Sequence, residues 1–301
     1  MGKPTEIAVI SGKGGAGKTV LAASLAKSTP GSVVADCDVD TPNMHLLLKP
    51  NLMSEHAFFG EKTAVMDGEL CTRCGDCFRT CRFGAIREID IPAGWSYSVD
   101  ALSCEGCGVC TMVCPEDAIL MKDARAGAWC VSSWDLGPFV HAHLTSARKN
   151  TETLVRILRR EASKIAGREG RRHIIIDGPA GIGATVVAAV EGVSLAVVVT
   201  EPTVSGINDL RRLIRLVQQI GIRTAAVINK YDLNTEVTLA IEEYLSINGV
   251  PLLGKICFST ELNRAVGAGE VVVNAGDDSA TQALRGISNR ILGLAAREVQ
   301  T

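Results

Sequence analysis

The feature that most limits the fold is a glycine-rich loop near the start of the chain, between an apolar run and an apolar helical stretch. Residues 7–10 are apolar and rich in β-branched types, the loop reads Ser-Gly-Lys-Gly-Gly-Ala-Gly-Lys-Thr over 11–19, and apolar residues prevail over 20–26. This order predicts a strand, a phosphate-binding loop and a helix. Glycines let successive backbone N–H groups face one anion, and the helix N-terminus adds its dipole.

This P-loop predicts a nucleotide site with a magnesium ion. Lys18 is expected to reach the β- and γ-phosphates, and Thr19 to bind Mg²⁺. The residues expected to contact the nucleotide directly are Gly12, Lys13, Gly14, Gly15, Ala16, Gly17, Lys18, Thr19 and Val20.

Three later segments end in polar residues that a P-loop enzyme needs. Asp36 and Asp38 close a predicted strand, where the carboxyl ends of parallel strands form the ligand crevice, and one of them is placed to orient water. Asp177 follows an apolar strand and is expected to hold Mg²⁺ in the Walker B manner. Gly181 is expected to offer its N–H to the γ-phosphate, and the Asn229 amide to read a purine edge.

Cysteines form the second strong pattern. Eight of the eleven lie between residues 71 and 114, in two runs with the spacing Cys-x2-Cys-x2-Cys-x3-Cys. That spacing is typical of bacterial ferredoxins, in which the fourth cysteine of each run binds the other cluster. Zinc remains the alternative, although zinc favours separated pairs. We therefore predict one [4Fe-4S] cluster on Cys71, Cys74, Cys77 and Cys114, and a second on Cys104, Cys107, Cys110 and Cys81.

Alternating strand and helix patterns predict a doubly wound α/β fold with a mostly parallel sheet. Residues 1–61 and 126–301 are expected to form one discontinuous nucleotide-binding domain, and residues 62–125 an inserted small ferredoxin-like domain. The strands expected in the larger domain are 7–10, 33–36, 174–177, 195–200, 225–229 and 253–257.

Composition argues against two classes of function, nucleic-acid binding and membrane insertion. The chain has 31 Lys and Arg against 33 Asp and Glu, a net charge of -2, which gives no overall attraction to nucleic acid. No apolar run approaches the roughly 18 residues of a membrane helix, and the start does not resemble a signal peptide. We therefore expect a cytoplasmic protein, in a compartment that keeps thiols reduced and favours metal binding by cysteines.

The loop Gly-Lys-Gly-Gly-x-Gly-Lys-Thr, with its second lysine Lys13, resembles the MinD/ParA class of P-loop ATPases. The resemblance covers residues 5–60 and about 125–300. It implies an ATP-sandwiched homodimer in which Lys13 reaches the partner's nucleotide and Asp38 positions the attacking water. It also implies slow turnover, with ATP acting as a conformational timer.

The whole chain resembles MinD-like ATPases with an inserted two-cluster ferredoxin domain, which leaves three functions open. The first couples ATP binding and hydrolysis to electron transfer through the clusters, with an unidentified redox or client protein as partner. The second is a positioning or partition ATPase whose clusters are structural or sense redox state. The third is an ATP-dependent carrier of iron-sulfur clusters. Eight ligands within one insert favour permanent clusters, so electron transfer is the preferred expectation.

Overall fold

The structure, a computed structural model, describes residues 3–92, 94–145, 150–271 and 278–296. The chain divides into two compact units. The P-loop unit comprises Met1–His56, Ala128–His143 and Thr151–Thr301, and the cysteine unit comprises Ala57–Gly127 and Leu144–Asn150. Each unit is described by itself below.

The P-loop unit is built on a sheet in which β1 lies between β8 and β9 and pairs with both in parallel. β2 is parallel to β8, so the carboxyl ends of β1, β2 and β8 meet at one edge, the expected ligand edge of such a sheet. The strand order among the described residues is β11-β10-β9-β1-β8-β2-β7-β6-β3. The bounds are β1 Thr5–Ser11, β2 Val33–Asp36, β7 Gly137–Leu144, β8 His173–Ala180, β9 Leu195–Thr200, β10 Thr224–Asn229 and β11 Leu252–Ile256.

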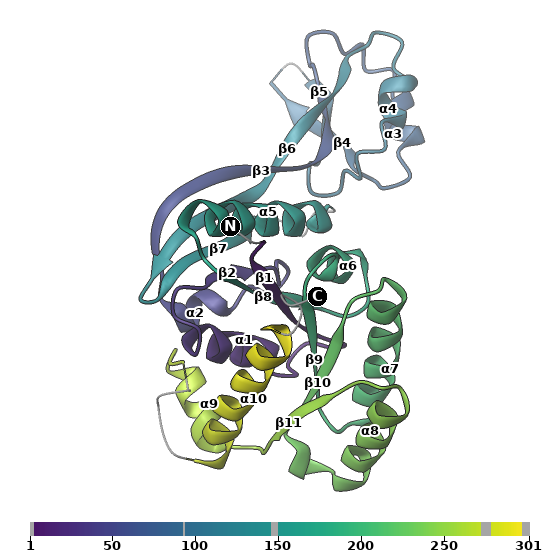
Figure 1. The fold of residues 1–301 in the computed structure, drawn as a ribbon. Helices are drawn as coiled ribbons and strands as arrows, with labels where there is room; N and C mark the ends of the chain where they lie inside the picture. Colours follow the sequence, from purple (N-terminus) through teal and green to yellow (C-terminus); the bar gives the residue numbers. More distant parts are fainter. Residues whose placement is uncertain (1–2, 93, 146–149, 272–277, 297–301) are drawn as a thin grey trace. The chain divides into compact units, whose positions relative to one another are not determined.

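Helices cover both faces of this sheet (Figure 1). On one face, α1, α2, α9 and α10 bury a core in which Leu21 and Ile287 join Ile7 and Val9 of β1. The helices α5 to α8 lie on the other face. Strands covered on both faces read as continuous apolar runs, which explains the pattern of β8 and β9. The bounds are α1 Lys18–Lys27, α2 Met44–Leu48, α5 Thr151–Glu169, α6 Ala184–Val190, α7 Val204–Gln219, α8 Thr235–Ile247, α9 Thr260–Gly267 and α10 Ser279–Ala295, with a 3-10 turn η1 at Tyr231–Leu233.

The cysteine unit contains a hairpin and two short helices. The strands β4 (Ile86–Ile91) and β5 (Gly94–Val99) are antiparallel, and the helices are α3 (Asp76–Thr80) and α4 (Val109–Met112). Two strands of 16 residues carry the chain into this unit and back, β3 (Asn51–Met66) and β6 (Ile119–Trp134).

All six strands expected in the larger domain are present, with ends shifted by a few residues. The expected insert, 62–125, lies within the observed span 57–127, but both of its edges fall inside the long strands β3 and β6. Sequence analysis did not identify these strands. Much of β3 is exposed and lacks the strict apolar alternation that marks a half-buried strand.

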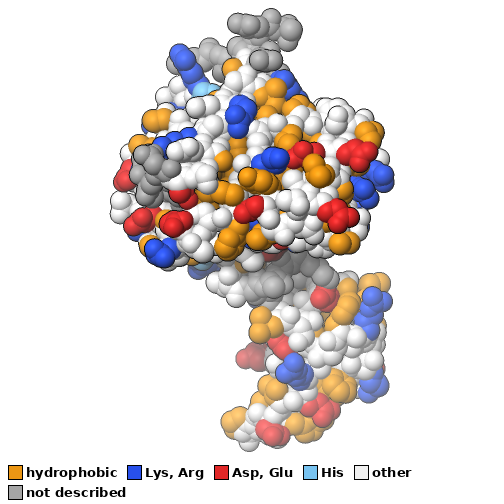
Figure 2. Space-filling view, turned by 90° about the horizontal axis from the view of Figure 1, so that it is seen from below, with side chains coloured by type: hydrophobic (Ala, Val, Ile, Leu, Met, Phe, Trp, Pro, Cys, Tyr) orange, Lys and Arg blue, Asp and Glu red, His pale blue; other side chains and the backbone are white. Residues whose placement is uncertain are grey.

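Charged side chains of both signs are mixed on the face of the molecule shown in Figure 2. No broad field of one sign appears there, in keeping with the net charge of -2. Among the described residues, no helix combines the length and the apolar character needed to cross a membrane.

Candidate nucleotide site and cysteine centre

The P-loop occupies the turn between β1 and α1, as the glycine pattern predicts. Gly17 adopts a φ of 97°, a conformation that other residues avoid, and a Cβ there would lie 2.4 Å from Asn229 Nδ2. Gly12 is equally constrained, because a Cβ would lie 2.4 Å from the Cβ of Asp209. The loop is therefore packed between β10 and α7, while a Cβ on Gly14 or Gly15 would meet nothing within 4 Å.

Lys18 forms a buried ion pair with Asp38. Both are almost fully buried, at 6% and 4% exposure. Lys18 begins α1, which follows β1 through the P-loop, and Asp38 lies just beyond β2. The carboxyl ends of β1 and β2 both lie at the ligand edge of the sheet, so Lys18 and Asp38 come together there. Burying a charged group costs free energy unless it is paired, and each of these charges supplies the partner of the other.

Asp36 has a different role from Asp38. Its Oδ1 accepts a hydrogen bond of 3.1 Å from the Asp38 N–H, and its Oδ2 one of 3.3 Å from the Met44 N–H. Burial raises the pKa of Asp36 well above its usual value, and the charge of neighbouring Asp177 raises it further. Asp36 thus fixes the backbone that carries Asp38 into the site.

Asp177 lies opposite Asp36 on the adjacent strand β8 and is completely buried. Neither of its carboxylate oxygens has a hydrogen-bond partner of normal geometry among the described residues. Burial raises the pKa of Asp177 to about 7, opposed by the Lys18 charge and the Thr19 hydroxyl. Orphaned carboxylate oxygens beside a threonine hydroxyl are oxygen ligands of the kind that Mg²⁺ takes, so these residues fit the expected ion.

Two expected nucleotide contacts are already engaged within the protein. The Gly181 N–H, expected at the γ-phosphate, donates to Ser11 O over 2.8 Å. The Asn229 Nδ2 donates to Ala16 O over 3.0 Å, and its Oδ1 accepts from the Lys230 N–H. Asn229 therefore braces the P-loop in this structure, and Gly181 must break its bond with Ser11 before it can serve a phosphate.

Lys13 bends toward the end of β9, where its ammonium contacts Glu201 and Thr203. Sequence analysis singled out neither partner. Glu201 directly follows the apolar strand β9, so the rule that selected Asp36 and Asp177, a polar residue at a strand end, would also have selected it.

A further pocket adjoins the P-loop beside β11. It has a volume of about 120 Å³, and sequence analysis did not anticipate most of its walls. Phe258 lines it with its backbone fixed by a 2.7 Å hydrogen bond to Asp232 Oδ1. The residues that line it are Gly15, Gly17, Val20, Asn229, Lys230, Ile256, Cys257, Phe258, Ser259, Leu262, Asn263 and Leu284. Apolar side chains such as Ile256 and Leu284 lie there beside polar ones such as Asn263, a mixture that suits a nucleobase.

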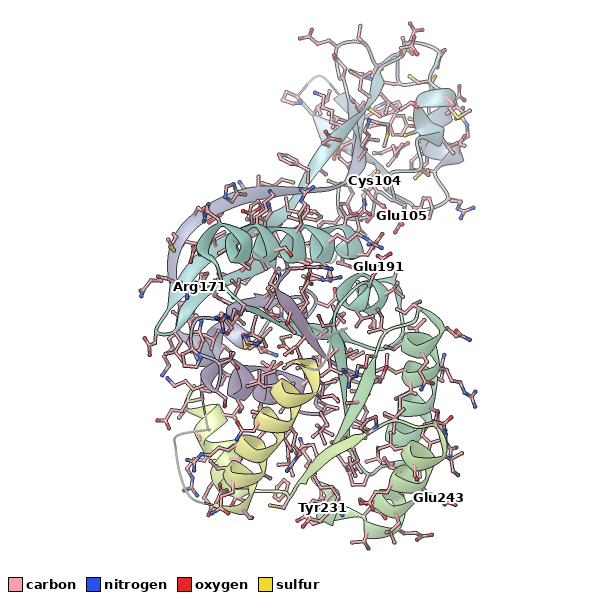
Figure 3. All side chains as sticks on the ribbon, in the orientation of Figure 1. Cys104, Glu105, Arg171, Glu191, Tyr231 and Glu243 are labelled. Carbon is pink, nitrogen blue, oxygen red and sulfur yellow. The ribbon has the colours of Figure 1, made fainter. Side chains whose placement is uncertain are left out.

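The eight clustered cysteines separate into two groups, each around a cavity. Sulfur atoms gather beside α3 and α4 (Figure 3). A cavity of about 340 Å³ is lined by Cys81, Cys104, Cys107 and Cys110. A second cavity, of only about 10 Å³, is lined by Cys71, Cys74, Cys77 and Cys114. These are the two sets that the ferredoxin spacing predicts, with the fourth cysteine of each run beside the other run.

The surroundings of the cysteines suit thiolate ligands of a cluster. The Ala118 N–H donates to Cys114 Sγ over 3.3 Å, the kind of contact that tunes iron-sulfur centres. Gly106, with a φ of 66°, has no room for a Cβ, which would lie 2.4 Å from Lys62 O. Burial raises the pKa of the Cys77 thiol, and charge on Cys71 raises it further, so metal binding would have to displace the proton.

Among the described residues, no three or more His, Cys, Asp or Glu side chains converge in a way that could hold a single metal ion. The four thiolates of a [4Fe-4S] cluster bind four different irons and surround a volume instead of one point.

Comparisons with known proteins identify the family. Residues 7–272 match the CobQ/CobB/MinD/ParA nucleotide-binding domain. The uncharacterized protein MJ0578 of Methanocaldococcus jannaschii is 33% identical over 234 residues, 76% of this chain and 79% of the relative. The septum site-determining protein MinD of Bacillus subtilis is 33% identical over 126 residues, 40% of this chain and 47% of that protein.

A solved structure agrees on the fold. The septum site-determining protein MinD of Pyrococcus horikoshii, solved with Mg-ADP, has a TM-score of 0.58 at 15% identity and covers 99% of this chain and 100% of its own. The P-loop, the strand order and the family match together show that this chain belongs to the CobQ/CobB/MinD/ParA nucleotide-binding family, as a P-loop ATPase of the MinD/ParA type.

Proposed function

We propose that the protein is an ATP-switched homodimer of the positioning type, in which slow hydrolysis controls association with a partner protein. The observation that carries the proposal is the meeting of Lys18, Asp38 and Asp177 at the ligand edge of the sheet. The relatives from Bacillus subtilis and Pyrococcus horikoshii are septum site-determining proteins, which favours positioning over the electron-transfer function that sequence alone preferred.

The proposed chemistry begins with an exchange of partners. When nucleotide phosphates bind, the Lys18 ammonium passes from the Asp38 carboxylate to the phosphate oxygens, which carry more charge. The freed Asp38 then accepts a hydrogen bond from water. That water attacks the γ-phosphorus while the bond to the ADP oxygen breaks, and phosphate leaves. Mg²⁺, held through Thr19 and Asp177, supplies positive charge for the phosphates.

Dimerisation is the second part of the proposal, and the resemblance of the loop around Lys13 supports it. If Lys13 completes the partner's site, the hydrolysis rate per protomer rises with protein concentration until the dimer is saturated. Phosphate release should be measured across a wide protein range, with sedimentation in a non-hydrolysable ATP analogue. Asp38→Asn is expected to dimerise with the analogue yet hydrolyse ATP very slowly. A rate per protomer independent of concentration would contradict an obligatory dimer.

We further propose that the cysteine unit holds two [4Fe-4S] clusters. The division of the eight cysteines between two cavities supports this assignment. Anaerobic iron and sulfide analysis would then give iron and acid-labile sulfide in equal amounts, with the paramagnetic resonance signal of reduced cubane clusters. Zinc without labile sulfide in anaerobically purified protein would overturn the proposal.

The role of the clusters separates the positioning function from electron transfer. An anaerobic redox titration should be run with ADP and then with a non-hydrolysable ATP analogue. A potential shift of about 59 mV equals a tenfold coupling for a one-electron couple, and nucleotide affinity must change by the same factor. Cys74→Ser is expected to spare ATP turnover if the clusters are structural or sensing. Loss of ATP turnover in that variant, together with a shift of the cluster potential, would favour electron transfer over positioning as the function.

A further inference from the structure

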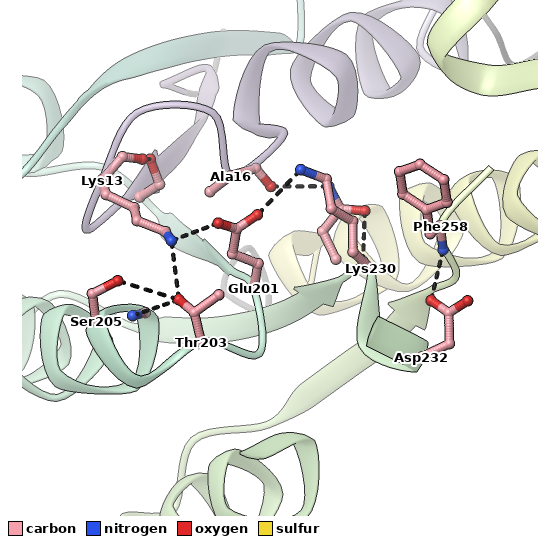
Figure 4. Close-up of polar contacts among 11 residues, drawn as sticks. Lys13, Ala16, Glu201, Thr203, Ser205, Lys230, Asp232 and Phe258 are labelled. Atoms are coloured by element: carbon pink, nitrogen blue, oxygen red, sulfur yellow. Dashed lines mark hydrogen bonds and ion pairs between the residues drawn. The ribbon is translucent and has the colours of Figure 1, made fainter. Parts of the chain in front are cut away.

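Both lysines of the P-loop are held by acids at the ends of strands. Lys18 pairs with Asp38 beyond β2, and Lys13 pairs with Glu201 directly after β9. The Lys13 Nζ lies 2.5 Å from Glu201 Oε1 and donates to Thr203 Oγ1 over 3.0 Å (Figure 4). In this structure each ammonium is thus engaged by an acid of the protein.

Glu201 also binds a second cation. Its Oε2 lies 3.2 Å from Lys230 Nζ, so one carboxylate bridges two ammonium groups. Burial alone would raise the pKa of Glu201, but the hydrogen bonds from Lys13 and Lys230 lower it overall. The carboxylate is 16% exposed and each lysine side chain 29%. An entering polyanion can therefore reach both lysines.

The surroundings make Glu201 necessary for this position of Lys13. Thr203 caps the N-terminus of α7, accepting from the Gly206 N–H over 3.0 Å. A helix N-terminus carries partial positive charge and disfavours a cation. Without the Glu201 carboxylate, Lys13 would face that dipole and the charge of Lys230. Its place at α7 thus depends on Glu201.

We infer that Glu201 is a positioning residue that holds Lys13 away from phosphate in the nucleotide-free protomer and releases it when nucleotide binds. The inference rests on the proposed function, because it assumes that Lys13 ends on a nucleotide phosphate. Glu201 is then the acid that pairs with Lys13 before phosphate does, as Asp38 is for Lys18. The carboxylate competes with phosphate, so its removal strengthens nucleotide binding.

The test uses the chain of 301 residues and five variants. Glu201→Gln removes the charge and keeps the shape, Glu201→Asp restores the charge, and Lys13→Ala is made alone and combined with Glu201→Gln. Glu242→Gln is the matched control, because Glu242 forms a 2.8 Å pair with Lys255 away from the P-loop. Two quantities are measured: the rate at which an amine-reactive reagent labels Lys13 without nucleotide, by mass spectrometry, and the apparent affinity for Mg-ATPγS, by calorimetry.

In Glu201→Gln we expect Lys13 to be labelled several times faster and Mg-ATPγS to bind about threefold more tightly, the size expected for removing a part-exposed ion pair. Glu201→Asp restores slow labelling, and Glu242→Gln changes neither quantity. In the Lys13→Ala background, Glu201→Gln strengthens binding less, because only Lys230 is then released. A merely structural Glu201 would instead give weaker binding, or the same change with and without Lys13, and either result overturns the inference. If the wild-type protein bound no Mg-ATPγS at all, the nucleotide-binding part of the proposed function would fail, and the inference would fall with it.

Discussion

The two units of the molecule differ in the size of their apolar cores. In the P-loop unit, β1, β8 and β9 are buried almost throughout and share a large apolar core with the helices. Among the described residues of the cysteine unit, one small buried cluster is formed by Ala64, Cys77, Ile86, Tyr97 and Ile119, with further cysteines packed around it. An apolar core of that size is small for about 70 residues, as expected if the clusters proposed above contribute to the stability of this unit.

The largest expected effect follows from that difference. Anaerobic removal of iron with a chelator should unfold the cysteine unit completely and leave the P-loop unit folded, because only the former depends on cluster ligation. Hydrogen exchange read by mass spectrometry would show lost protection across residues 57–127, with β1 and β8 unchanged as the internal control. Retained protection across the cysteine unit would mean that its small core suffices.

The next effect is confined to the P-loop unit. Lys18→Ala should lower the rate of ATP hydrolysis by about 10²–10³-fold, because one charged group at the phosphates is lost. Phosphate release measures the change, and the visible absorption of the clusters should stay the same. A parallel loss of absorption would show that the two units depend on each other, against the comparison.

A third prediction concerns the P-loop unit away from its site. Arg159 Nη2 lies 2.7 Å from Glu6 Oε2, and both side chains are largely buried. Arg159→Leu leaves the Glu6 carboxylate buried without its cation, and should lower the free energy of unfolding of this unit by about 3 kcal/mol. Denaturant titration followed by circular dichroism measures this change in the free energy of unfolding.

Arg156→Leu is the matched control for that change. Arg156 pairs with Glu191 at the surface, where both side chains are more than half exposed, and its replacement should cost less than about 1 kcal/mol. Replacing Glu6 by Gln together with Arg159→Leu should recover part of the loss. Equal losses of unfolding free energy in the two arginine variants would show that burial of the ion pair does not decide how large the loss is.

The smallest effect depends on pH. His141 on β7 stacks on Phe139, and its Nε2 lies 2.9 Å from Ser132 Oγ. Burial lowers the pKa of His141 to about 4, with the charges of His45 and His143 adding to the shift. Between pH 6.5 and 4 the unfolded chain therefore binds more protons than the folded one, and stability falls as pH falls.

His141→Gln should remove that loss. After allowance for partial exposure, the variant should gain about 2 kcal/mol relative to wild type between pH 7 and pH 4. Denaturant titrations of both proteins at several pH values give the difference. Parallel stability curves for the two proteins across this range would contradict a neutral, half-buried His141.

Local pattern predicted most of the P-loop unit. The glycines of the loop and the buried strands leave clear signals, because Gly17 must adopt positive φ and β8 must be apolar on both faces. The spacing of the cysteines likewise predicted the two sets that share cavities. The family and the ATPase class predicted from the loop are confirmed.

The sequence could not show which contacts the residues of the site make with one another. That Gly181 donates to Ser11, that Asn229 braces Ala16 and that Glu201 binds Lys13 depends on residues brought together from distant parts of the chain. Spacing predicts which groups reach one sheet edge, but the partner of each group is set by tertiary packing. The metal content and the dimer stay predictions for the same reason.

The pairing of Lys13 with Glu201 and of Lys18 with Asp38 has a kinetic consequence. Lys18 is paired with Asp38, and Lys13 shares Glu201 with Lys230, so these acids reduce the positive potential that the loop projects into solvent. Long-range attraction should contribute little to the encounter with nucleotide, and the association rate should respond only weakly to ionic strength. Inorganic phosphate should then compete poorly with nucleotide. Binding must break the Lys18–Asp38 and Lys13–Glu201 pairs, and only a ligand that also fills the neighbouring pocket gains enough contacts to offset that cost.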